Sequence, residues 1–343
     1  MPLIKIIFRS IGRNKTRSLL TVCSIAIAII VFGIMRTFIS AWYAGADAAS
    51  ATRLVTRNAI SIIFPLPLSY KERIRCIEGV KTVSYASWFG GVYIDERNMF
   101  PNFAVDGASF LDLYSEFIIP PEQRADFLAD RKGAVAGKKI VERFGWKIGD
   151  TIVLKSMIFS SSMEFTLRAV YQGRDRSVDE TQFLFHWEYL NEKVKDIFPS
   201  EANMVGCYMI SISHPDLATT VKQAIDAGFQ NSRAETLTET EKAFNMEFIA
   251  MSDAIIKTIH IVSFFVLFII LAVVANTMVM VGRERSTEFA TMRILGFTYR
   301  HIATIIFGET FTLALVGCGL GILLTIPICD VIGKALANFV PVF

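Results

Sequence analysis

The chain has 343 residues, of which 52% are hydrophobic and 20% are charged, and its mean hydropathy is +0.44. This composition is more apolar than that of an ordinary soluble domain and predicts membrane-spanning helices together with a water-exposed domain. The formal net charge of +3 is too small to indicate a nucleic-acid-binding protein.

The cysteines and histidines give no sign of a disulfide scaffold or a metal site. The sequence has five cysteines and four scattered histidines, and their spacing fits neither pattern. Cys76 and Cys207 fall in the polar middle region, and the sequence leaves open whether they pair, because it does not show their proximity. We therefore expect no metal or cofactor bound by this chain.

Residues 1–17 are predicted to form an amphipathic helix on the cytoplasmic membrane surface, ahead of a first transmembrane helix at residues 18–40. The apolar residues of the first segment share one helical face: Leu3, Ile4, Ile7, Phe8 and Ile11. The second segment is apolar over the roughly 20 residues that a bilayer requires. A cleaved signal peptide is the alternative, but its apolar core is shorter than this run.

Residues 41–237 are predicted to form a large α+β domain between the first and second spans. Segments rich in β-branched and aromatic residues predict strands near 58–64, 81–88, 91–96, 102–107, 150–156, 164–173 and 206–213. The stretches at 69–79 and 215–229 predict helices. A strand–helix–strand order at both ends of the region indicates one subdomain built from its two flanks, with a β-rich insertion between them.

Nothing in this region predicts an enzyme. We find no nucleophile with a matching base and no close carboxylate grouping. The stretch "GAVAGKK" at residues 133–139 comes nearest to a phosphate-binding loop. Its spacing is short and it ends in lysine instead of serine or threonine, so we interpret it as a turn and expect no ATP site.

Residues 238–281 are predicted to form a stalk helix that continues into the second transmembrane helix. Phe244, Phe248, Met251 and Ile255 recur every three or four residues, and no glycine or proline interrupts the stretch up to the span. A continuous helix of this kind would carry motion rigidly between the domain and the membrane. The alternative is a helix packed on the domain and followed by a flexible joint.

Residues 282–301, which include "RERSTEFATMRILGF", are predicted to form a coupling loop with a short helix that ends at Gly296. An apolar ridge with a charged rim would fit a groove on a partner protein. The residues that we assign to this docking helix are Glu284, Arg285, Glu288, Phe289, Met292, Arg293, Leu295 and Gly296. A plain basic loop is the alternative, and it leaves the two glutamates and the ridge unexplained.

Residues 302–330 are predicted to form the third transmembrane helix, followed by an extracytoplasmic segment at 331–343. Three glycines give this span a smooth face for close approach of another helix: Gly317, Gly319 and Gly321. The sequence does not say which helix approaches. Glu309 is either a contact that helps to transmit motion or an interfacial carboxylate, since an acid inside a span is costly unless it is paired.

Basic residues set the orientation. They precede the first span and occupy the loop between the second and third: Lys5, Arg9, Arg13, Lys15, Arg17, Arg283, Arg285, Arg293 and Arg300. Because lysine and arginine favour the cytoplasmic side, the N-terminus and the coupling loop are predicted to be cytoplasmic and the domain at 41–237 extracytoplasmic.

Four stretches, in this order, resemble a known family: "IFRSIGRNKTRSLLTVCSIAIAI", "VAGKKIVERFGWKIGDTIVLKS" with "FTLRAVYQG", "RERSTEFATMRILGFTYRHI" and "ETFTLALVGCGLGILL". They are similar to the permease subunits of the MacB and FtsX superfamily of ABC transporters. In the third stretch, the family's Arg-x-x-Glu, later Arg and Leu-Gly correspond to Arg285, Glu288, Arg293, Leu295 and Gly296. The family has a fourth span, which does not appear after the third one here. Either the sequence is truncated or the fourth helix is absent, and we expect truncation.

The resemblance implies a non-catalytic membrane subunit of the bacterial plasma (inner) membrane, working as a homodimer or with a related permease. A separate cytoplasmic ABC ATPase, which holds the ATP and magnesium, would bind the coupling loop. Its cycle would drive extracytoplasmic motion, called mechanotransmission, for export or efflux, with a periplasmic adaptor and an outer-membrane channel as further partners. The alternative is a membrane-anchored sensor or assembly scaffold with an extracytoplasmic ligand-binding domain.

Overall fold

The computed structural model describes residues 15–47, 49–159, 161–175, 178–251 and 253–336. Within them the chain forms two compact units, a helical one within residues 1–41 and 251–337 and an α/β one within residues 42–250. Most of the amphipathic helix predicted at residues 1–17 falls outside the described residues.

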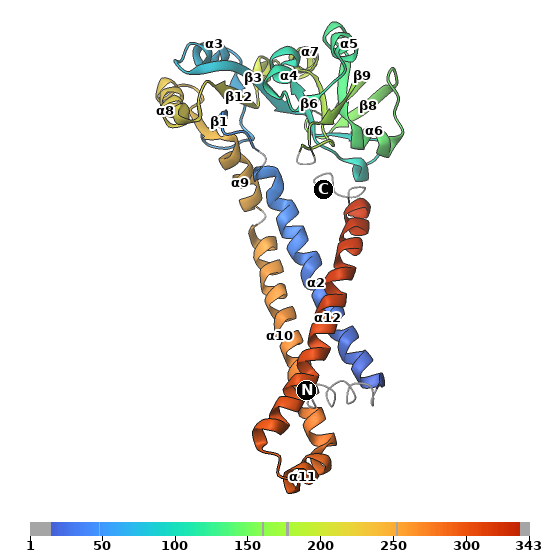
Figure 1. Ribbon diagram of the computed structural model, residues 1–343. Coiled ribbons are helices and arrows are strands. Elements are labelled where there is room, and N and C mark those ends of the chain that lie inside the picture. Colours follow the sequence, from blue (N-terminus) through green and yellow to red (C-terminus); the bar gives the residue numbers. More distant parts are fainter. Residues whose placement is uncertain (1–14, 48, 160, 176–177, 252, 337–343) are drawn as a thin grey trace. The chain divides into compact units, whose positions relative to one another are not determined.

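Over its described residues, the helical unit contains three long helices and one short one (Figure 1): α2 (Lys15–Asp47), α10 (Asp253–Glu284), α11 (Ser286–Ile294) and α12 (Tyr299–Leu336). The stretches long and apolar enough to cross a membrane are Ser18–Ser40, Ile256–Glu284 and Tyr299–Val331. The three predicted spans are thereby confirmed. A helix is the expected form because a single segment in hydrocarbon must satisfy all of its backbone hydrogen bonds internally.

The third helix is longer than predicted at both ends. It begins at Tyr299 instead of residue 302, and it continues to Leu336 through part of the segment that we assigned to 331–343. The sequence of this extension, "VIGKAL", contains a lysine, which is unfavourable inside a span, but no proline ends the helix before Leu336.

The α/β unit is built on one large mixed sheet. Its strand order is β13-β1-β12-β3-β5-β10-β7-β9-β8-β4, and β6 pairs with β9 outside this path. The strands are β1 (Arg53–Asn58), β3 (Val80–Trp88), β4 (Gly91–Tyr93), β5 (Asn102–Val105), β6 (Phe117–Ile118), β7 (Gly133–Gly137), β8 (Thr151–Ser156), β9 (Ser162–Gly173), β10 (Phe183–His186), β12 (Cys207–Ile212) and β13 (Thr236–Thr240). A small separate sheet pairs β2 (Leu66–Pro67) with β11 (Met204–Val205).

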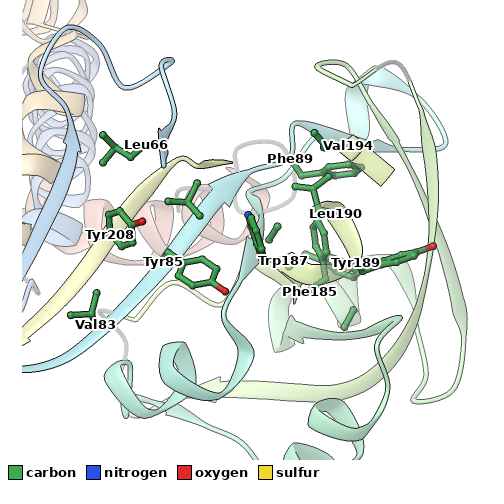
Figure 2. Close-up of a cluster of buried hydrophobic side chains, with 14 of the residues drawn as sticks. Leu66, Val83, Tyr85, Phe89, Phe185, Trp187, Tyr189, Leu190, Val194 and Tyr208 are labelled. Carbon is green, nitrogen blue, oxygen red and sulfur yellow. The ribbon is translucent and has the colours of Figure 1, made fainter. Parts of the chain in front are cut away.

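Helices cover both faces of this sheet. The larger core cluster includes buried side chains from α3 (Tyr70–Arg75), α6 (Lys138–Phe144), α7 (Trp187–Ile197) and α8 (Ala218–Gly228). The smaller cluster includes those of α4 (Gly107–Leu113) and α5 (Pro121–Ala129). Figure 2 shows the larger cluster, in which Tyr85 of β3 lies beside Trp187 at the start of α7. The predicted α+β domain is thus confirmed, with its two flanks and its insertion sharing one sheet.

The sheet curls back on itself in the insertion. Strand β3 pairs with β5, whereas β4 pairs with β8, and only Phe89 and Gly90 separate β3 from β4. Phe89 is fully buried in this bend, and its ring lies 5.3 Å from that of Phe185 (Figure 2). Gly90 has a φ of +62°, which a residue with a side chain rarely adopts, so glycine suits the bend.

Two local predictions for this unit were wrong. The strand predicted at 58–64 lies earlier, at Arg53–Asn58, because the arginines of this strand are buried as ion pairs and therefore conceal its position in the sheet. The stretch 133–139 is not a turn: its first five residues form β7, which is wholly buried between β9 and β10. A Cβ on Gly137 would collide with the backbone of Glu180, so this glycine allows a close approach of two segments.

The predicted stalk begins later than residue 238. Residues 238–240 belong to β13, which pairs with β1, and helix α9 covers Glu241–Met251. Thr236, Thr238 and Thr240 are β-branched and suit a strand better than a helix. Helix α10 begins at Asp253, and residue 252 lies outside the described residues, so the continuity of the stalk stays a prediction.

A buried arginine ties the strand that follows α2 to the helix that precedes α10. Arg53 at the start of β1 donates from Nε to Glu241 Oε2 (2.8 Å) and from Nη2 to Glu116 Oε1 (2.6 Å). The side chains of Arg53 and Glu241 are only 7% and 9% exposed. Burial by itself lowers the pKa of Arg53, but the Glu116 hydrogen bond, Tyr114 and the nearby carboxylates outweigh it and raise the pKa.

Glu241 has further partners. It accepts the backbone N–H of Ser50 (2.9 Å) and the hydroxyl of Tyr114 (3.1 Å). Four residues further along β1, Arg57 pairs with Glu247 of α9 at 2.6 Å. Two arginine–carboxylate pairs therefore fix α9 to β1.

Replacing Glu241 by alanine should destabilise the α/β unit by roughly 3–5 kcal/mol, because Arg53 would stay buried with one counter-charge removed. Denaturant unfolding of the full chain in detergent, followed by tryptophan fluorescence, measures this. The control is Arg75→Ala, which removes an exposed pair with Glu72 and should cost less than about 1 kcal/mol. Equal effects of the two changes would contradict the structural role of Glu241.

Cys76 and Cys207 are both free in the structure. Cys76 is exposed at the end of α3. The thiol of Cys207 lies 3.8 Å from the carbonyl oxygen of Ala86, and burial raises its pKa to about 12. The two cysteines therefore differ sharply in reactivity.

A membrane-impermeant maleimide at pH 7.5 should label Cys76 within minutes and leave Cys207 unmodified until the protein is denatured. Peptide mass spectrometry of labelled, non-reduced protein makes the measurement, and the Cys76→Ser variant is the control. A disulfide-linked Cys76–Cys207 peptide would contradict this expectation.

Candidate functional site

The candidate site is the connection between α10 and α12, which contains α11 (Figure 1). Arg285 breaks the helix between α10 and α11, with φ −105° and ψ +16°. Gly296 ends α11 with a φ of +92°. The N–H groups of Gly296 and Phe297 donate to the carbonyls of Arg293 and Met292, both at 3.0 Å, which is the Schellman pattern of a helix end. Both ends of α11 are thus defined by the backbone.

A buried ion pair anchors this connection to α12. Arg285 donates from Nη1 to Glu309 Oε2 at 3.1 Å and from Nε to Glu288 Oε2 at 2.8 Å. The side chain of Arg285 is 7% exposed and that of Glu309 is fully buried, whereas Glu288 is 38% exposed. An acid inside a spanning helix is costly unless paired, and Arg285 supplies the pair. One guanidinium therefore holds α11 and α12 together.

Apolar side chains surround this pair. The guanidinium of Arg285 lies 5.3 Å from the ring centroid of Phe289, which is itself 8% exposed. Val281 of α10 and Ile305 of α12 are fully buried. Because these groups exclude water, the charge interaction is stronger than it would be at the surface.

The prediction that Phe289 forms part of an outward ridge was wrong. Phe289 is buried, Met292 is half-buried, and the outward apolar side chains are those of Ile294, 87% exposed, and Leu295, 73% exposed. The nine-residue helix α11 turns its Phe289 face inward because that face lies beside the Arg285–Glu309 pair. The sequence pattern identified the amphipathic helix, but it does not show which apolar face meets the rest of the chain.

The remaining predicted docking residues lie on the surface. Glu284 and Arg293 are exposed. The guanidinium of Arg293 lies over the ring of Tyr299, 3.8 Å from its centroid, and donates to the Tyr299 hydroxyl. This contact bridges the connection between α11 and α12 on the outer side. The sequence analysis did not include Ile294 and Tyr299 among the docking residues. Their position next to the predicted ridge is the one sequence signal that could have identified them.

The predicted glycine face packs on α2. A Cβ on Gly317 would lie 2.9 Å from Ile25 Cβ, and one on Gly321 would lie 2.7 Å from Ile29 Cβ, so a side chain at either position would not fit. Gly33 of α2 makes the same kind of close approach to Thr325. Gly319 has open space around it and lies outside this contact, which corrects its assignment to the packing face. The partner helix is therefore the first span.

The described residues contain no group of three histidine, cysteine, aspartate or glutamate side chains placed to hold a metal ion. What the site presents is an exposed apolar pair, Ile294 and Leu295, on a loop that the buried Arg285–Glu309 pair anchors.

The connection between α10 and α12 lies in a part of the chain that matches a known protein family. The sequence model described as "FtsX-like permease C-terminal" matches residues 260–342. An uncharacterized ABC transporter permease protein of Mycobacterium tuberculosis is 25% identical over 214 residues, which cover 58% of this chain. The match covers 22% of that relative's own length, so this chain corresponds to a small part of it.

Solved structures give weaker likenesses to the α/β unit. The extracellular domain of the noncanonic ABC-type transporter YknZ from Gram-positive bacteria has a TM-score of 0.39 at 10% identity, covering 55% of this chain and 100% of that one. The periplasmic region of MacB from Actinobacillus actinomycetemcomitans has a TM-score of 0.42 at 8% identity, covering 58% and 94%. Likenesses at this level carry no functional argument. The match over residues 260–342 agrees with the resemblance seen in the sequence, and this part of the chain is similar to the FtsX-like permease C-terminal family.

Proposed function

We propose that this chain is the membrane subunit of an ABC transporter. It couples ATP hydrolysis by a separate ATPase to a conformational change of its extracytoplasmic α/β unit. The family match over residues 260–342 and the permease relative support this proposal. ATP and magnesium bind the partner ATPase, and this chain is the non-catalytic subunit.

The observation that carries the proposal is the exposed pair Ile294 and Leu295 at the end of α11. Two large apolar side chains at the tip of a polar connection favour a protein partner over water. The buried Arg285–Glu309 pair fixes this connection to α12. A displacement of α11 by a bound partner would therefore move α12 as well. A docking site of this construction fits a subunit that is moved by its partner.

Firm contacts of the same kind lie within each of the two units. In the α/β unit, the Arg53–Glu241 and Arg57–Glu247 pairs fix α9 to β1. Helix α12 packs on α2 through Gly317 and Gly321. We infer that these ion pairs and close helix contacts carry displacement within each unit.

The wider assembly follows from the same proposal. The chain lies in the bacterial plasma membrane with the α10–α12 connection in the cytoplasm, as its basic residues indicate. It works as a homodimer or with a related permease, and it drives export or efflux from the outer side, with an adaptor and an outer-membrane channel where the host has two membranes. These assignments rest on analogy with the family.

Changing Ile294 and Leu295 together to aspartate should abolish recovery of the ATPase, because both exposed side chains would lose their apolar contact with it. The test is a pull-down in mild detergent from the native host, with the ABC ATPase identified by mass spectrometry and its activity assayed in the eluate. We expect at least a tenfold loss, since burying two such side chains is worth about 3 kcal/mol or more.

The matched control is Ile60→Asp with Ile63→Asp, since these two isoleucines are exposed to a similar degree, 82% and 84%, in the α/β unit. This control should recover the ATPase as the wild type does. Failure of the wild-type chain to recover any ABC ATPase would instead favour the sensor or scaffold.

Glu309→Gln should loosen α11 without unfolding the rest of the chain, because Arg285 would lose its buried counter-charge while Glu288 remains. Removing one partner of a buried pair costs roughly 3–5 kcal/mol. Hydrogen exchange of the amides at residues 286–296 in the full chain should therefore speed up by at least tenfold.

Two variants make this measurement specific. Glu288→Gln removes the partly exposed partner and should change the exchange rate by less than about fivefold. Arg285→Met with Glu309→Leu replaces the pair by apolar groups and should restore slow exchange. Unchanged exchange in Glu309→Gln would show that the ion pair does not anchor the loop.

A further inference from the structure

A groove of about 730 Å³ runs between α10 and α12 in the helical unit. Val274 and Met278 of α10 form one wall, and Phe307, Phe311 and Ala314 of α12 lie along the other. Its two threonines, Thr304 and Thr310, donate their hydroxyls to carbonyls of their own helix, at 2.8 and 3.0 Å. The walls therefore offer almost purely apolar contact.

One end of this groove carries a positive charge. Arg300 is its single charged lining residue, and it lies one residue after the start of α12 at Tyr299. It is exposed, and no carboxylate among the described residues forms an ion pair with it. By contrast, Arg285 and Arg293 in the same connection have partners. A guanidinium at the water boundary of a span is suited to a phosphate, which it can bind through two parallel hydrogen bonds.

The dimensions of the groove match one membrane leaflet. Arg300 and Ala314 are separated by fourteen helical steps, about 21 Å along the helix. Half of the hydrocarbon core is about 15 Å thick, and a headgroup adds several ångströms. An acyl chain that runs along Phe307 and Phe311 would therefore place its phosphate near Arg300.

We propose that this groove binds an anionic phospholipid from the leaflet that contains the α10–α12 connection, with the phosphate on Arg300 and an acyl chain along the apolar walls. The charge at one end favours a lipid over an apolar helix of a second copy, which offers that charge no partner. The lipid would lie against α12 on both sides of Glu309, at the level of the Arg285–Glu309 pair. The site does not depend on the ATPase and is testable without it.

Lipid selectivity tests the proposal. The full chain is reconstituted in nanodiscs of phosphatidylcholine that contain spin-labelled phosphatidylglycerol or spin-labelled phosphatidylcholine, and the immobilised fraction of each is measured. The wild type should prefer phosphatidylglycerol by about fivefold, the effect of one basic residue at the membrane surface. Arg300→Gln should remove that preference. Arg283→Gln, which removes an exposed arginine of α10 that does not line the groove, should retain it.

A photo-crosslinker identifies what fills the groove. p-Benzoylphenylalanine in place of Phe311 should yield an adduct of phospholipid mass, and this adduct should fall in Arg300→Gln but not in Arg283→Gln. A crosslink to a second copy of the chain, or no lipid adduct, would overturn the proposal. Equal association of the two lipids with the wild type, or loss of selectivity in both arginine variants, would overturn it as well.

Discussion

The buried ion pair between Arg285 and Glu309 constrains the connection between α10 and α12. A fully buried carboxylate on a spanning helix is tolerated only with a counter-charge. That requirement fixes where the chain leaves α10, because the arginine at the break between α10 and α11 must reach α12. It also turns Phe289 inward, and so leaves Ile294 and Leu295 as the apolar residues available to a partner.

The α/β unit solves a similar problem in a similar way. Arg53 and Arg57 belong to a strand inside the sheet, where unpaired charges would be prohibitive, and α9 supplies Glu241 and Glu247 to pair with them. In both units an arginine at a junction between elements holds a helix in a fixed position. A buried pair of this kind fixes the position of a helix even where its net contribution to stability is small.

The helical contacts differ in character from these pairs. Helices α2 and α12 approach closely through glycines, with no polar group required, because Gly317 and Gly321 let the backbones come near Ile25 and Ile29. Helices α10 and α12 instead leave an apolar groove with a basic end. Helix α12 thus packs closely on α2, whereas it leaves a groove beside α10.

The sequence by itself determined the three spans, their loops and the α+β character of the middle region. Hydrophobicity, helix-ending glycine and β-branched segments are local signals, and they placed Gly296, β3, β5, β8, β9 and β12 well. It also singled out Arg285, Glu288 and Glu309, because charged residues beside or within a span are conspicuous. It did not predict β1 and β7 correctly. The buried arginines of β1 and the glycines of β7 are untypical of strands, and neighbouring strands in the sheet stabilise both segments.

Tertiary structure alone decided which faces meet. A nine-residue helix with several apolar side chains has more than one plausible inner face, and the choice of Phe289 over Leu295 follows from the position of Glu309, twenty residues away in the chain. The pairing of Arg53 with Glu241, the choice of α2 as the partner of Gly317 and Gly321, and the open side of Gly319 are of the same kind. They depend on residues far apart in sequence that come together only when the chain folds.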